Sequence, residues 1–151
     1  MSELYDLYQE VILDHNKRPR NFGELAEPDH RAKGHNPLCG DELELTVRVA
    51  DGKIDEIRFT GSGCAISKAS ASLMTESVAG RPLAEVDELF HKFHELLTGD
   101  PSVKENASRE LGKLAVFEGV REFPVRVKCA TLAWHTLQSA LENAAEPAST
   151  E

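Results

Sequence analysis

Three cysteines and one aspartate are the residues of this chain best suited to chemistry. Cys39 and Asp41 lie two residues apart in a loop that contains proline and glycine, and Cys64 follows a Gly-Ser-Gly run. Three thiolates and one carboxylate can fill the four positions of a tetrahedral zinc site, and thiolates are also the nucleophiles of sulfur chemistry. The candidate site consists of Cys39, Asp41, Cys64 and Cys129, which include all the cysteines of the chain.

A predicted hairpin brings two of these residues together. Apolar and polar residues alternate from Leu43 to Val49, which is the pattern of a half-buried strand, and Asp51-Gly52 is a strong hairpin turn signal. The return strand runs from Ile54 to Thr60. Counting back from the turn places Asp41 and Cys64 near the same open end of the hairpin. In an extended segment, Cys39 and Asp41 would also point to the same face.

Two cysteines precede patterns of helical periodicity. Cys64 and Cys129 each stand at a predicted helix start, where unpaired backbone N–H groups and the positive end of the helix dipole favour a thiolate. The alternative is that all three cysteines are ordinary buried residues, since free cysteine packs as a small apolar side chain. The sequence has no Cys-x₂-Cys pair, so spacing alone does not decide between these interpretations.

The remaining pattern predicts an α+β fold, in which a small antiparallel sheet of about three strands is covered by helices. Apolar periodicity predicts helices over 3–15, 65–78, 83–97, around 111–117, and from 129 to about 141. Segment 20–38 lacks periodicity and is expected to hold a short extended stretch leading to Cys39, and 123–127 is predicted to be extended. We expect a single domain over 1–143 and a disordered tail over 144–151.

Composition excludes several classes of function. The chain has 151 residues and a net charge of −9, with no block of Lys and Arg, which argues against nucleic-acid binding. No apolar run approaches the length of a membrane span, and the N-terminus lacks the pattern of a signal peptide. An odd number of cysteines without a secretion signal favours a reducing, cytoplasmic location. The acidic balance would also suit a basic protein partner.

The motifs around the cysteines resemble the IscU/SufU family of iron–sulfur cluster assembly proteins. The segments that carry the resemblance are Asn36-Pro37-Leu38-Cys39-Gly40-Asp41, Gly63-Cys64-Ala65-Ile66-Ser67 and Cys129, and the similarity extends to about residue 142. The resemblance implies a metal site formed by Cys39, Asp41, Cys64 and Cys129. It also implies that Cys39 accepts sulfur from a SufS-type cysteine desulfurase, and that the other partners are downstream iron–sulfur assembly proteins.

Three departures from the scaffold members of that family favour its SufU branch, whose members are zinc-dependent sulfurtransferases. Lys128 stands where scaffold proteins have histidine, and Glu122-Phe123-Pro124-Val125-Arg126 replaces their Leu-Pro-Pro-Val-Lys motif. The segment between Cys64 and Cys129 is also longer. The alternatives are a scaffold on which the same side chains build a [2Fe–2S] cluster, and a structural zinc domain that mediates protein binding.

Arg126 is a further candidate, as charge support for the site. Three thiolates and a carboxylate around Zn²⁺ leave a net charge of about −2, which a nearby cation would offset. If Arg126 and Cys129 straddle a helix start, the guanidinium can approach the metal. The alternative is a solvated surface arginine.

Overall fold

The structure is a computed structural model that describes residues 3–99, 111–121, 123–142 and 148–149, without the side chains of residues 3–8 and 148–149. The elements in chain order are α1 (Glu3–Lys17), β1 (His30–Asn36), β2 (Asp41–Ala50), β3 (Lys53–Ser62), α2 (Ala65–Val78), α3 (Leu83–Thr98), the 3₁₀ helix η2 (Gly112–Val120), α5 (Pro124–Leu141) and β4 (Ala148–Ser149). The sheet has the order β3-β2-β1-β4. The first three strands are antiparallel and β4 is parallel to β1.

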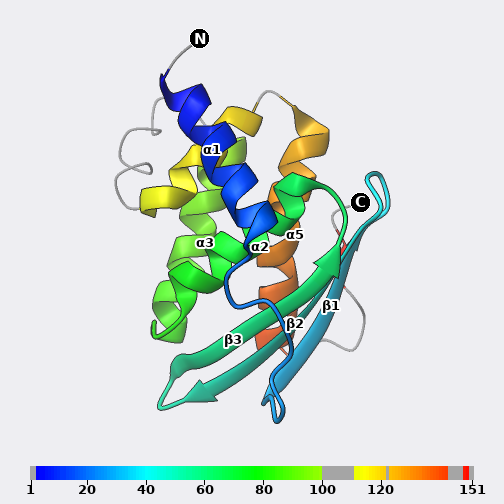
Figure 1. Ribbon diagram of the computed structural model, residues 1–151. Helices are drawn as coiled ribbons and strands as arrows, with labels where there is room; N and C mark the ends of the chain where they lie inside the picture. The colour runs from blue at the N-terminus through cyan, green and yellow to red at the C-terminus, as the bar shows by residue number, and fades with distance from the viewer. Residues whose placement is uncertain (1–2, 100–110, 122, 143–147, 150–151) are drawn as a thin grey trace.

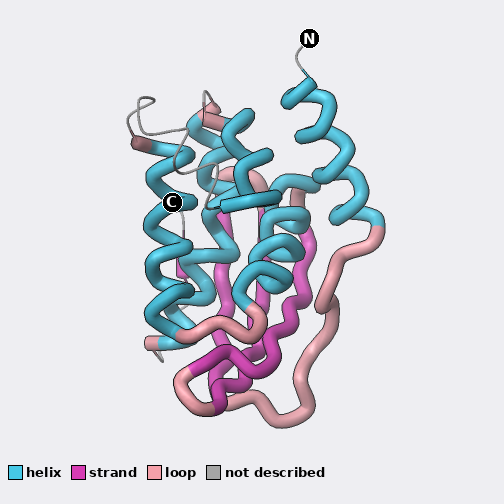
Figure 2. Tube along the Cα trace, turned by 90° about the vertical axis from the view of Figure 1, so that its left-hand side faces the viewer, coloured by secondary structure: helices cyan, strands magenta, loops and turns pink. Residues whose placement is uncertain are grey.

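The helices gather on one face of the sheet (Figures 1 and 2). Helices α2 and α5 pack against the strands, whereas α1 and α3 pack against these inner helices. The architecture is therefore α+β, as the sequence predicts. The tail expected to be disordered contains β4, while residues 143–147 and 150–151 lie outside the described part of the chain. Disorder of this tail stays a prediction.

The predicted hairpin is confirmed as β2 and β3. Asp51 and Gly52 both have positive φ, 54° and 73°, which is the two-residue turn that matches the twist of antiparallel strands. Leu45 pairs with Phe59 and Val47 with Ile57, and all four side chains are buried against the helices. Strand alternation thus turns one face of the hairpin into part of the core.

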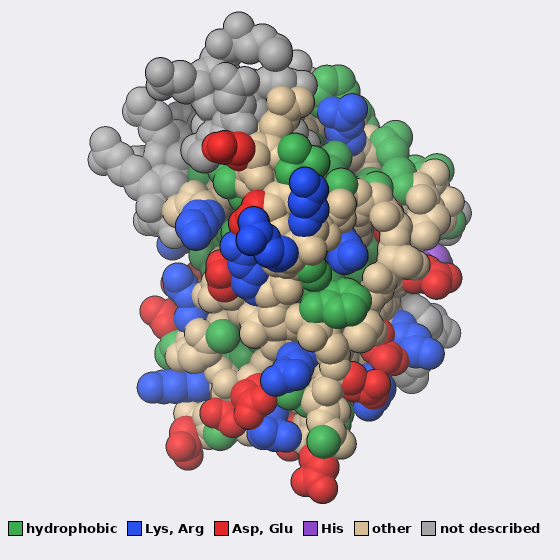
Figure 3. Space-filling model, in the orientation of Figure 1, with side chains coloured by type: hydrophobic (Ala, Val, Ile, Leu, Met, Phe, Trp, Pro, Cys, Tyr) green, Lys and Arg blue, Asp and Glu red, His purple; other side chains and the backbone are tan. Residues whose placement is uncertain are grey.

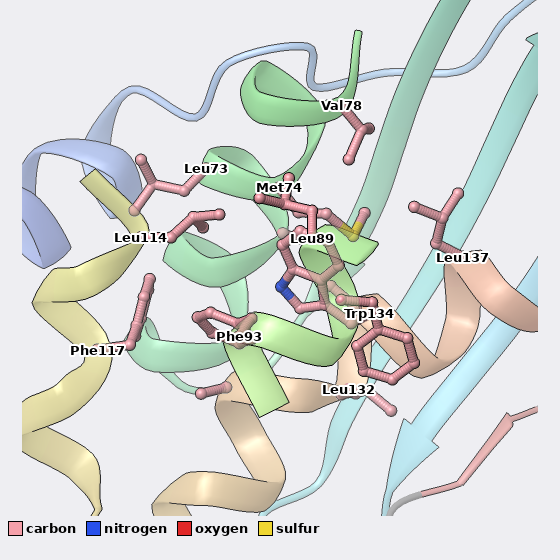
Figure 4. Close-up of a cluster of buried hydrophobic side chains, with 14 of the residues drawn as sticks. Leu73, Met74, Val78, Leu89, Phe93, Leu114, Phe117, Leu132, Trp134 and Leu137 are labelled. Atoms are coloured by element: carbon pink, nitrogen blue, oxygen red, sulfur yellow. The ribbon is translucent and has the colours of Figure 1, made fainter. Parts of the chain in front are cut away.

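An aromatic stack joins the helices above the sheet (Figure 4). The Trp134 ring of α5 stacks on Phe90 and Phe93 of α3, with centroids 6.0 and 5.2 Å apart. Phe93 in turn meets the edge of Phe117 from η2 at 5.8 Å. Such pairs each contribute about 0.5–1.5 kcal/mol beyond the burial of their area. This stack fixes α5, and with it Cys129, relative to the other helices.

Of two expectations about extended segments, one is confirmed and one was wrong. The extended stretch expected before Cys39 is β1, a strand of seven residues, and its inward positions carry small residues that approach α5 closely. Gly34, for example, has no room for a Cβ beside Leu132 and Thr136. The expected extended run at 123–127 is instead the start of α5, with Pro124 in its first turn. Proline is favourable there because its fixed φ suits a helix and its missing N–H is not needed.

Other segments pair with part of each margin of the sheet. Along β3, the Gly23 N–H donates to the Phe59 carbonyl at 2.8 Å, and the Phe59 N–H donates to Asn21 at 3.0 Å. At the start of the same strand, the Ile54 N–H donates to the Arg81 carbonyl at 3.0 Å. On the other side, β4 pairs with Gly34 and His35 of β1.

Acidic and basic side chains are mixed on the surface shown in Figure 3. Arg20 pairs with Asp14 at 2.7 Å, and Arg48 pairs with Glu56 across β2 and β3 at 3.1 Å. Exposed pairs of this kind contribute little to stability, but they fix which charges neighbour one another. No described helix is long and apolar enough to cross a membrane.

A buried histidine links α1 to α2. His15 is 2% exposed, and its Nδ1 lies 2.7 Å from the Ser72 hydroxyl. The same hydroxyl oxygen accepts the Arg20 N–H at 2.8 Å. Burial, followed by the nearby charge of Arg20, lowers the pKa of His15. The fold therefore favours the neutral imidazole.

We predict that His15 makes the protein less stable in mild acid. In the unfolded chain this imidazole takes up a proton near its ordinary pKa of about 6.5, whereas the folded chain resists protonation. The free energy of unfolding should fall as pH decreases from 7 to 5, and His15→Gln should flatten this dependence in denaturant titrations. His135 adds a slope of the same sign, because burial lowers its pKa too. Equal slopes for His15→Gln and the unmodified chain would contradict the prediction, and exposed His35→Gln is the matched control.

Candidate metal and sulfur site

The candidate residues meet at one end of the sheet, where the β1–β2 loop, the junction of β3 and α2, and the N-terminal part of α5 come together. The loop joining β1 to β2 lies at the same end as the tip of β3, which leads into α2 (Figure 1). Glu42 pairs with Ser62 in the last register of the hairpin. The prediction that Asp41 and Cys64 lie at the same open end is confirmed, since the Cys64 N–H donates to Asp41 Oδ1 at 2.7 Å.

Cys39 is the exposed member of the site. It lies in the four residues between β1 and β2, and their closing pair is Asn36 and Asp41. The Gly40 N–H donates to the Asn36 carbonyl at 2.9 Å, and Gly40 has a φ of +71°, which glycine adopts without strain. The expectation that Cys39 and Asp41 share one face of an extended segment was therefore wrong. They approach each other because the loop curves back over the sheet end.

Asp41 is the buried acceptor at the centre of the site. Asp41 is only 1% exposed. Oδ1 accepts the Cys64 N–H, and Oδ2 lies 3.3 Å from Asn36 Nδ2 and 3.8 Å from Cys64 Sγ. A buried carboxylate needs such partners, because burying its oxygens without hydrogen bonds would be costly.

The sulfur atoms surround this carboxylate from separate elements. Ligand atoms of Cys39, Asp41 and Cys129 all lie within 4.8 Å of one another, and Cys129 Sγ lies 3.3 Å from Cys39 Sγ. Sulfur atoms on one tetrahedral zinc ion would be roughly 3.8 Å apart. Cys64 is not a member of this group of three, but it contacts Asp41. Thiolate and carboxylate donors in this arrangement fit zinc and also fit iron.

Two of the cysteines lie in contrasting environments. Cys64 is the N-cap of α2, where its Sγ accepts the Ser67 N–H at 3.4 Å, so its predicted place at a helix start is confirmed. A hydrogen bond from the Cys129 thiol lowers the pKa of Cys64 to about 7, with help from Ser67. That same bond, together with burial, raises the pKa of Cys129. Cys129 lies in the second turn of α5, not at its start, so the helix-start argument fails for it.

Arg126 and Lys128 lie near Cys129 in sequence, but among the described residues neither forms a hydrogen bond or ion pair with the ligand atoms. Arg126 is exposed in the first turn of α5, and its guanidinium lies 4.6 Å from the centre of the Phe123 ring. Because α5 begins at Pro124, Arg126 and Cys129 do not straddle a helix start. Lys128 is half-buried beside Cys129. Charge support from Arg126 stays a prediction.

Sequence reasoning did not single out Asn36 as a site residue. Asn36 is fully buried, and its Nδ2 lies 3.3 Å from Asp41 Oδ2 and 3.4 Å from Cys129 Sγ. The signal that could have identified Asn36 is its place in β1, whose length the sequence pattern did not reveal. Once β1 is recognised, its inward positions alternate as far as Asn36, so a polar residue at the last of them needs buried partners.

Comparisons with known proteins agree with this geometry. The family described as "NifU-like N terminal domain" matches residues 7–130. A protein of Streptococcus pyogenes serotype M1, named iron–sulfur cluster assembly scaffold protein IscU, is 42% identical over 96% of this chain and 89% of its own length. The protein of Bacillus subtilis strain 168 named zinc-dependent sulfurtransferase SufU is 36% identical over 91% of this chain and 90% of its own.

A solved structure shows the same fold. It comes from Fervidobacterium islandicum AW-1 and is described as a candidate iron–sulfur cluster assembly scaffold protein for the SUF system. It is 34% identical, with a TM-score of 0.79 over 91% of this chain and 98% of the other. The names of these relatives thus include both scaffold and sulfurtransferase.

We predict that Gly63→Ala disrupts metal binding. Gly63 has a φ of +137°, and a Cβ there would overlap Asp41 Oδ1 and lie 2.7 Å from the Asp41 Cα. Gly80→Ala is the matched control, because Gly80 also has a positive φ but no atom within 4 Å of an added Cβ. Both variants should lose stability, on the order of 1–3 kcal/mol from backbone strain. Only Gly63→Ala should lower zinc affinity in chelator competition, and equal affinities of the two variants would contradict the role assigned to Gly63.

Proposed function

Because this chain belongs to the family of NifU-like N-terminal domains, the IscU/SufU proteins of iron–sulfur cluster assembly, we propose that it is a zinc-dependent sulfur acceptor. In this proposal a cysteine desulfurase of the SufS type supplies persulfide sulfur, and downstream iron–sulfur assembly proteins receive it. The site is formed by Cys39, Asp41, Cys64 and Cys129. The relative named as a sulfurtransferase supports the proposal by similarity.

The observation that carries the proposal is the unequal burial of the site. Cys39 is exposed on a short loop, whereas Cys129 and Asp41 are buried in regular elements. A partner can therefore reach the Cys39 sulfur while the other groups stay in place. A purely structural metal site would be expected to enclose all its ligands.

The sulfur transfer is an exchange between thiolate and persulfide. The Cys39 thiolate attacks the outer sulfur of the donor persulfide and forms a new S–S bond. The S–S bond of the donor breaks, and its electron pair remains on the donor cysteine, which leaves as a thiolate. One sulfur atom moves and no external oxidant or reductant is needed. A bound zinc ion would keep the cysteines deprotonated near neutral pH.

The protein groups around Cys39 support this exchange in two ways. Cys129 Sγ lies 3.3 Å from Cys39 Sγ, which places the acceptor sulfur directly beside a buried ligand atom. The loop is tied to the end of β1, because the Cys39 and Gly40 N–H groups both donate to the Asn36 carbonyl, and this holds the acceptor sulfur at an exposed position. Arg126, next to the apolar side chains of Phe123 and Val125, would add positive charge at the rim during partner docking.

The alternative is a scaffold on which a [2Fe–2S] cluster is assembled as cargo and passed on. The relative from Streptococcus pyogenes favours it, since its name is that of a scaffold. Thiolates bind either metal, so the donor set does not discriminate. Lys128 does discriminate, because an ammonium group cannot act as a ligand while it keeps its proton.

We predict that Cys39→Ala abolishes sulfur acceptance but keeps much of the zinc. Asp41, Cys64 and Cys129 remain, and water can fill a fourth position, as in open zinc sites. Cys129→Ala should instead lose zinc and sulfur acceptance together. The measurements are metal content and persulfide labelling followed by mass spectrometry, after incubation with a cysteine desulfurase and free cysteine. Sulfur acceptance by Cys39→Ala at the rate of the unmodified chain would remove Cys39 from the acceptor role.

We also predict that Lys128 limits cluster retention. After reconstitution with iron and sulfide, the unmodified chain should keep little [2Fe–2S] cluster through desalting, whereas Lys128→His should keep more because an imidazole can bind iron. Sulfur acceptance should not improve, since Cys39 lies on a different loop. The readouts are the absorption spectrum and the iron and sulfide content. A stable cluster in the unmodified chain that passes intact to an apo-ferredoxin would favour the scaffold over the sulfurtransferase.

A further inference from the structure

Asn36 is the buried polar residue that touches most parts of the site without being a ligand candidate. It is the last residue of β1 and is 0% exposed. Its Nδ2 lies 3.3 Å from Asp41 Oδ2 and 3.4 Å from Cys129 Sγ. Its Oδ1 accepts the Leu38 N–H at 3.3 Å. One side chain therefore contacts β2, α5 and the loop of Cys39.

The chemistry of the amide matches these three contacts. A carboxamide has two N–H donors on nitrogen and a carbonyl acceptor on oxygen. Both donors face groups that are anionic when they bind a metal, and the acceptor faces a backbone N–H. The Leu38 contact fixes which end of the amide is oxygen, because only oxygen can accept that hydrogen. The amide cannot itself supply a nitrogen ligand, since its nitrogen has no available lone pair.

We propose that Asn36 is the positioning residue of the metal site. Its amide orients the Asp41 carboxylate and the Cys129 sulfur toward a common ion, and it anchors the loop that carries Cys39. Hydrogen bonds to ligand atoms hold their orientation and reduce the repulsion between neighbouring anions. The proposal rests on the metal site of the proposed function, and it adds a residue that controls how tightly that site holds its ion.

A simpler role for Asn36 would be to stabilise the loop through Leu38 alone. Asn36→Asp separates the two roles, because aspartate keeps an oxygen for the Leu38 N–H but loses both donors. It also places a negative charge beside Asp41 and Cys129. A loop-stabilising residue would tolerate this change, whereas a donor to the metal ligands would not. His35→Ala is the matched control, since His35 neighbours Asn36 in β1 but is exposed.

The experiment measures zinc affinity of the full chain by competition with a chromophoric chelator, and the absorption bands of the cobalt-substituted protein. Asn36→Asp should bind zinc about 10–100-fold more weakly, the usual effect of losing a hydrogen bond to a metal ligand. Its thiolate-to-cobalt bands should also shift. His35→Ala should change neither readout. Unchanged affinity and unchanged bands in Asn36→Asp would overturn the proposal.

Asn36→Ser guards against a failure of the aspartate variant to fold. Serine retains one hydroxyl donor, so the Asn36→Ser chain should bind zinc more weakly than the unmodified chain. If Asn36→Asp folds, the affinity of Asn36→Ser should lie between those of the other two chains. Affinity equal to that of the unmodified chain would overturn the proposal. The affinity ratios test Asn36, whereas sulfur acceptance by the unmodified chain tests the proposed function. An unmodified chain that binds neither zinc nor cobalt would overturn both.

Discussion

The candidate site depends on the hydrogen bonds that the buried carboxylate of Asp41 accepts. This carboxylate is buried at the end of the sheet and is satisfied by the backbone of Cys64 and the amide of Asn36. These two contacts connect the start of α2 and the end of β1 to the start of β2. A buried charge without such partners would cost several kcal/mol, so the carboxylate and its donors must be placed together. The sheet end, the α2 N-terminus and the cysteine loop are therefore one structural unit.

The sequence predicts part of this unit well. The alternation from Leu43 to Val49 and the Asp51-Gly52 turn define the hairpin and place Asp41 near Cys64. They do not reveal the irregularity between Arg48 and Val49, which shifts the pairing by one residue. The helix start at Cys64 follows from the break at the preceding glycines. These features depend on neighbours close in sequence, so local patterns reveal them.

The parts that the sequence predicted incompletely or wrongly depend on contacts between distant segments. β1 carries glycine, histidine and asparagine, which do not resemble a strand, yet Gly34 is needed where β1 meets Thr136 of α5. The start of α5 was misjudged because Val125 and Val127 favour strands, although Pro124 suits a first helical turn. Asn36 was not singled out because the sequence pattern did not show that β1 extends to this residue. Its importance appears only when its partners in β2 and α5 are in place.

The occupied margins of the sheet limit how another molecule can bind here. Backbone groups of β3 are engaged by residues 21–23 and by the turn around Arg81, and β1 is paired with β4. An incoming peptide that tried to extend the sheet as an added strand would first have to displace these segments. At these covered positions, recognition would therefore depend on side chains and loop shape. The same protection lowers the tendency of neighbouring copies to join edge to edge into aggregates.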